Sequence, residues 1–149
     1  MRQTIEGFGK LRLRVGFFET AKYEDGTPIA YVATIHEYGA PQRGIPPRPF
    51  MRPTQQAQQD NWNAGFASGA RAVVEGRRTP EQVLGAIGGN AAGEISATIA
   101  AIASPPLKEA TIRDKQRQYA KKGGVGNLAK PLVRTGILIA SPTFEVDEK

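Results

Sequence analysis

The most constraining feature of this chain is a run of five prolines, at positions 41, 46, 47, 49 and 53 of APQRGIPPRPFMRP. Proline has no backbone N–H and fixes φ near −65°, so neither the interior of a helix nor the interior of a sheet can hold this run. The sequence therefore predicts an extended arm over residues 40–53, with polyproline-like geometry.

Two short elements are predicted before the arm. Residues 11–18, LRLRVGFF, alternate apolar and other side chains with the period of a half-buried strand that has a basic outer face. A turn is expected at residues 24–28, EDGTP. Residues 29–39 fit a short helix that Gly39 would end, and the β-branched residues in this segment leave a strand as the alternative.

Two long helices are predicted after the arm. The first begins at Thr54 as its N-cap and continues to about Val74, because apolar residues recur at helical spacing from Trp62 onward. The second follows Thr79-Pro80, where a cap residue, proline and acids give a strong start signal, and ends near residue 102, with a kink considered at its Gly-Gly pair. One helical turn near residue 136 and a strand over 143–147 complete the pattern.

This order of elements indicates an α+β fold, in which a small antiparallel sheet is packed by two long helices. With 149 residues and 40% apolar content, the chain is expected to form a single domain over residues 1–149. Residues 107–130 show no sustained period, and residues 108–134 are therefore predicted to form a long, flexible basic loop.

The charge of the chain is concentrated in that loop. The net charge is +6, and residues 108–134 carry eight basic side chains against two acidic ones, an excess that equals the whole net charge. Such a segment either contacts phosphates without reading base sequence or is a solvated surface. The candidates for phosphate contact, in a loop that would line a DNA channel, are Lys115, Arg117, Lys121, Lys122 and Lys130.

Most catalytic chemistry is excluded by composition. The chain has no cysteine and one histidine, His36, so a thiol nucleophile, a disulfide framework and a zinc site are all excluded. The acidic residues form no spaced cluster, and no phosphate-binding glycine motif is present. We therefore expect no enzymatic activity, no cofactor and no metal. We also expect no membrane-spanning segment and no signal peptide, which predicts that the protein stays in the compartment where it is made.

Two blocks of sequence carry a resemblance. The first, residues 15–53, contains a Val-Gly strand, a Gly-Thr-Pro turn, Glu37-Tyr38-Gly39 and IPPRPFMRP; the second, residues 104–141, contains SPPLKEATI and KPLVRTGILIAS. In this order they resemble a family of bacteriophage virion morphogenesis proteins, the neck and tail-completion proteins of long-tailed phages. Arg134 and Ser141-Pro142 depart from the family pattern, which has an acid before the Thr-Gly and a Ser-Ile pair.

The resemblance implies a structural subunit of the virion, made in the cytoplasm of the host bacterium and located in the neck or upper tail. It implies a ring of copies, a hexamer being favoured, around the channel for genomic DNA, with other neck and tail proteins as partners and no small-molecule substrate. The alternative is a small basic DNA-binding protein without enzymatic activity, although the chain has no helix-turn-helix, RRM or zinc signature.

The arm is the candidate subunit interface. Phe50 and Met51 would insert into a neighbour as apolar anchors, and Arg48 and Arg52 would pair with carboxylates. The alternative is that the arm crosses its own domain ahead of the first long helix. The complete set of candidate interface residues is Glu37, Tyr38, Arg48, Phe50, Met51 and Arg52.

Overall fold

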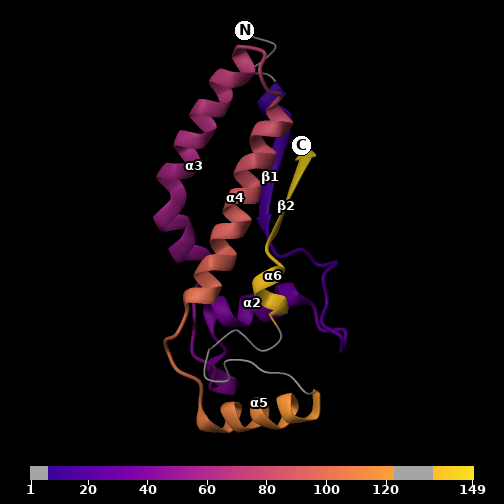
Figure 1. Cartoon of the computed structure of the whole chain (residues 1–149), viewed down its shortest axis with the longest axis vertical. Helices are drawn as coiled ribbons and strands as arrows, with labels where there is room; N and C mark the ends of the chain where they lie inside the picture. Colours follow the sequence, from indigo (N-terminus) through magenta and orange to yellow (C-terminus); the bar gives the residue numbers. More distant parts are fainter. Residues whose placement is uncertain (1–6, 123–135) are drawn as a thin grey trace.

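The computed structural model describes residues 7–122 and 136–149, and it confirms the mixed helix and strand fold (Figure 1). The sheet consists of two antiparallel strands, and the long helices pack against it. In chain order the elements are β1 (Leu11–Gly16), α2 (Ile29–Tyr38), the 3-10 turn η1 (Pro41–Arg43), α3 (Met51–Val74), α4 (Pro80–Ala101), α5 (Glu109–Lys122), α6 (Ile137–Ala140) and β2 (Thr143–Glu148).

The two strands come from opposite ends of the described chain. Leu13 pairs with Val146 and Val15 with Phe144, and the side chains of Leu13 and Phe144 lie against Gly88 of α4. On the outer face the guanidinium of Arg12 lies 2.7 Å from Asp147, and further Arg-carboxylate pairs continue along the sheet. The alternation of β1 therefore separates an apolar inner face from a charged outer face, as its sequence predicts.

Helix α4 is central, because it contacts both strands and α3. Its predicted start is confirmed: Thr79 and Gln82 form a reciprocal capping box, with Pro80 at the first helical position. The helix runs without a break through its Gly-Gly pair. A side chain at Gly88 would overlap the ring of Phe144, so this glycine makes room for β2.

Helix α3 begins earlier than predicted. The arm was expected to extend through residue 53, but Met51 already opens the helix, and Thr54 lies inside it. The Thr54 hydroxyl donates to the carbonyl of Phe50, inside the first turn, and lies 2.6 Å from the Thr98 hydroxyl of α4. Within the arm, residues 41–43 form η1, so extended backbone is confined to the short stretch before α3.

The prediction of a basic loop over residues 108–134 is wrong for its first half, where residues 109–122 form α5. The remainder of that segment lies outside the described residues. Helix α5 is polar on average and carries few apolar residues, so its sequence resembles that of a solvated segment. It lies across the end of the molecule opposite the turn between α3 and α4 (Figure 1).

The main apolar core forms where α2, the start of α3, the end of α4 and α6 meet. Phe50 and Ile99 are completely buried there, and the ring of Phe17 packs edge-on against that of Phe50 with centroids 5.7 Å apart. The buried members of this core are Ile29, Ala33, Phe50, Ile95, Ile99 and Leu138.

Candidate interaction surfaces

Glu37 is the most highly connected polar side chain of the arm region. It projects from α2, and its carboxylate accepts hydrogen bonds from the backbone N–H of Phe50 at 2.7 Å and of Met51 at 2.9 Å. It also accepts from the backbone N–H and from Nε of Arg52. These N–H groups belong to the start of α3 and have no partner within the helix, so Glu37 caps α3 from outside.

The environment of Glu37 favours its ionised form. Burial alone would raise the pKa of this carboxyl, but the hydrogen bonds from Phe50, Met51 and Arg52 outweigh burial and lower the pKa below its ordinary value. The guanidinium of Arg52 remains more than half exposed and lies 5.2 Å from the centroid of the Tyr38 ring. Tyr38 is 65% exposed, so the Tyr38–Arg52 pair lies at the surface above a buried carboxylate.

Arg48 joins the arm to the segment that follows α4. Its side chain is buried, and its Nε and Nη2 donate to the backbone carbonyls of Pro105 and Pro106 at 2.9 and 3.1 Å. His36 lies near this cation. Burial, together with the charges of Arg48 and Lys115, lowers the pKa of His36 to about 4, so its imidazole is neutral at pH 7. Among the described residues, no group hydrogen-bonds the buried Nδ1 of His36.

The structure divides the six candidate interface residues into two groups. Glu37, Arg48 and Phe50 are buried inside their own chain, so the prediction that Phe50 anchors a neighbour is wrong and the alternative, that the arm packs on its own domain, holds for them. The physical reason is that the hydrogen bonds made by Glu37 and by Arg48 hold the arm against its own chain. Tyr38 and Arg52 are exposed, and Met51 is partly buried.

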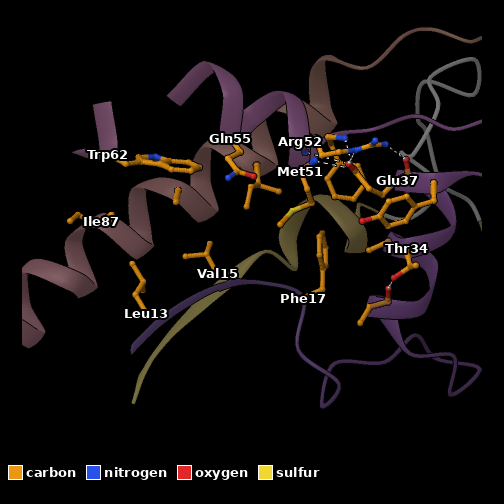
Figure 2. A pocket seen from close by; sticks show the side chains of 16 residues that line it. Leu13, Val15, Phe17, Thr34, Glu37, Met51, Arg52, Gln55, Trp62 and Ile87 are labelled. Atoms are coloured by element: carbon orange, nitrogen blue, oxygen red, sulfur yellow. Dashed lines mark hydrogen bonds and ion pairs between the residues drawn. The ribbon is translucent and has the colours of Figure 1, made fainter. Parts of the chain in front are cut away.

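Met51 lines a groove of about 520 Å³ between β1, α2, α3 and α4 (Figure 2). Leu13 and Val15 of β1 form one wall, and Trp62 of α3 forms the opposite wall, where its indole N–H donates to Glu94 at 2.6 Å. The floor is made by α4, and Glu37, Tyr38 and Arg52 close the polar end. Residues of β1, α2, α3 and α4 contribute to the groove, whereas β2 contributes none.

The candidate phosphate-contacting residues are also divided. Lys115 is 6% exposed, so the prediction that it contributes to an open basic surface is wrong; it faces inward toward His36. Arg117 and Lys121 are exposed on α5. The side chain of Lys122 and all of Lys130 lie outside the described residues.

The described part of the chain offers no group of three or more His, Asp or Glu side chains that could hold a metal ion. In the same residues, every helix is too short or too polar to cross a membrane.

No protein-family model matches this chain, and searches of curated proteins and of solved structures give no significant match.

Two features of these surfaces were not predicted from the sequence. The role of Glu37 as a cap was missed because its partners are thirteen to fifteen residues away in the chain. The sequence does not predict the groove, because its lining residues come from four elements that are separate in the chain. A usable signal was the composition of α3, in which Gln and Asn surround an isolated tryptophan.

Proposed function

We propose that this chain is a structural, non-enzymatic subunit of a tailed bacteriophage particle, located in the neck or tail-completion region and assembled as a ring around the DNA channel. The proposal carries forward the resemblance of residues 15–53 and 104–141 to virion morphogenesis proteins. It requires a subunit that has a stable core, surfaces for other copies, and basic groups near DNA.

The observation that carries the proposal is that the two resembling blocks pack together. Arg48 of the first block donates to Pro105 and Pro106 of the second, 57 and 58 residues away. Phe50 and Ile29 of the first block share the core with Leu138 of the second. The two blocks, which are separate in the chain, therefore form one packed unit, as a single family domain would require.

The surface of this unit suits an assembly protein. An apolar groove lies open between β1 and α3, and α5 presents basic side chains at one end of the molecule. Phosphate contacts from such side chains position DNA without selecting its sequence. The described residues contain no group of three or more His, Asp or Glu side chains that could hold a metal ion, and the lowered pKa of His36 keeps its imidazole neutral at pH 7.

Genetic deletion tests the proposal. In the phage or prophage that encodes this chain, we expect loss of the gene to leave filled heads and separate tails that fail to join or to mature, with infectivity restored by the gene in trans. The matched control is the Ala64→Gln variant, which changes an exposed position of α3 and should complement fully. Infectious particles of normal yield without the gene would refute the proposal.

A DNA-binding protein is the second candidate, and the helical state of α5 favours it, because a basic helix is a common element for entering a DNA groove. Competition among unrelated duplexes at fixed salt separates the two functions. A structural subunit should bind all duplexes weakly, with Kd of about 10⁻⁴ to 10⁻⁶ M. A free regulator should retain one duplex about a thousandfold more tightly than the others.

A further inference from the structure

In the part of the chain that the structure describes, no further strand pairs with either edge of the small sheet. In an antiparallel pair, every second N–H and C=O of each strand points away from its partner. Within the described ranges the sheet has only β1 and β2. In those ranges Leu13, Val15, Phe144 and Val146 make no backbone hydrogen bond outside the ladder. Open edges of this kind readily add a further strand.

The charges on the two strands differ in sign. Arg12 and Arg14 lie on the outer face of β1, and Glu145 and Asp147 lie opposite them on β2. Inside one chain these groups already pair at 2.7 to 3.3 Å. Two β1 edges brought together would oppose arginines, and two β2 edges would oppose carboxylates. Only β1 of one copy against β2 of another places opposite charges face to face.

A groove flanks one edge of the sheet, and an exposed helix face flanks the other. Beside the free edge of β1 lies the apolar groove, whose wall includes Leu13 and Val15 (Figure 2). Beside β2, α4 presents a flat, exposed Ala/Gly face, whose residues recur at spacings of three and four. Its member Gly89 lies near the ring of Phe144, and a side chain at Gly93 would meet nothing within 4 Å. The Ala/Gly face consists of Ala86, Gly89, Gly93 and Ala97.

We propose that copies of this chain associate head to tail, with the open edge of β1 pairing antiparallel with the open edge of β2 of the next copy, and the Ala/Gly face of that copy entering the groove. This inference rests on the proposed function, because it names the contact between ring subunits. The two surfaces are different patches of one molecule, so the contact is heterologous and generates a closed ring or an open filament.

Two single-cysteine chains test the direction of this contact, because the protein has no cysteine of its own. Lys10→Cys labels β1 and Lys149→Cys labels β2 at the point where the backbone N–H of Lys149 donates to the carbonyl of Lys10. The two chains are mixed, treated with a short bismaleimide over a range of concentrations, and separated by mass. Each substitution removes one lysine next to a strand end, whereas the apolar residues and Arg12, Arg14, Glu145 and Asp147 remain unchanged.

We expect the mixed product to exceed both like-chain products by about tenfold, because like-edge contacts oppose equal charges. Ala64→Cys, on exposed α3 surface, is the control and should give no preferred product with either chain. Equal yields of mixed and like-chain products overturn the inference. So does the absence of the mixed product at the highest soluble concentration.

A second pair of variants tests the groove contact without disturbing the fold. Gly93→Gln with Ala97→Gln adds bulk to an exposed face and should leave the melting temperature unchanged or raised, since glycine disfavours helix. We expect the yield of mixed product to fall about tenfold, whereas Ala64→Gln leaves it unchanged. An undiminished yield in the double variant overturns the groove contact.

Failure of the edge contact can be distinguished from failure of the proposed function. If native mass spectrometry shows a closed ring but the mixed product is not preferred, the edge contact is wrong while the structural role stands. If the mixed product dominates but infectious particles form normally without the gene, the edge contact stands and the neck role is wrong.

Discussion

Replacing Glu37 with glutamine should destabilise the fold more than any exposed charge change. The Glu37 side chain is 6% exposed and accepts four hydrogen bonds, from three backbone N–H groups and Nε of Arg52. Glutamine keeps one acceptor oxygen, and its NH2 group faces the N–H groups of the α3 start, so at least two donors lose their partner. Each unpaired buried donor costs about 1–3 kcal/mol, which gives a total of roughly 3 kcal/mol.

Arg52 adds little to this cost, because its guanidinium is more than half exposed and regains water when the pair is broken. For a domain of this length, the loss corresponds to a fall in Tm of roughly 6–12 °C. Thermal and urea unfolding followed by circular dichroism measure it. The matched control is Glu75→Gln, which removes an exposed ion pair with Arg77 and should cost less than about 1 kcal/mol.

The stability difference between the wild-type protein and Glu37→Gln should depend on pH. The folded pKa of Glu37 is depressed from its ordinary value of 4.5. Its contribution to stability is therefore complete above that value and is lost as the pH falls through the folded pKa. The difference between wild type and Glu37→Gln should be constant near neutral pH and should shrink below about pH 4. A Glu37→Gln variant no less stable than Glu75→Gln would refute the account of the cap.

Three further perturbations test the packing and the charge. Phe50→Ala should lower the free energy of unfolding in denaturant by about 3–5 kcal/mol, because the Phe50 ring is fully buried in the monomer core. A loss below about 1 kcal/mol would contradict the burial of this ring. Gly69→Ala should cost about 1–3 kcal/mol, because its Cβ would overlap Val83, and Val83→Ala should recover part of that loss if the α3–α4 contact is as described. Binding of the isolated chain to any duplex should weaken steeply between low and moderate salt, and an affinity insensitive to salt would contradict phosphate contact by α5.

Helices and strands were predictable where the residues that start, end or pattern the element lie in the element itself. The capping box at Thr79 and Pro80 marked the start of α4 within one residue, and Gly39 marked the end of α2. The strand at 143–147 and the helical turn after Gly136 were also identified. In each case the local sequence contains the signal, which is an alternation of apolar and polar residues, a cap residue or a glycine that adopts positive φ.

Elements that depend on distant partners were not predictable. The start of α3 at Met51 depends on a carboxylate from α2, and the local signal at Thr54 pointed to a later start. Helix α5 carries few apolar residues, and the run of charged residues that contains it is also typical of a loop. Lys115 was assigned to an open basic surface, although tertiary packing turns it inward toward His36. In these three cases tertiary contacts override local propensity.

The central claim is a ring of this chain in the neck of a phage particle, and a reconstruction of purified particles from the encoding genome tests it most directly. The account predicts density for the sheet and the α3–α4 hairpin at the junction of head and tail, repeated around the DNA channel, with β1 of each copy beside β2 of the next. Mass spectrometry of the same particles should detect the chain at a low, fixed copy number. Complete, infectious particles that lack this chain would contradict the claim.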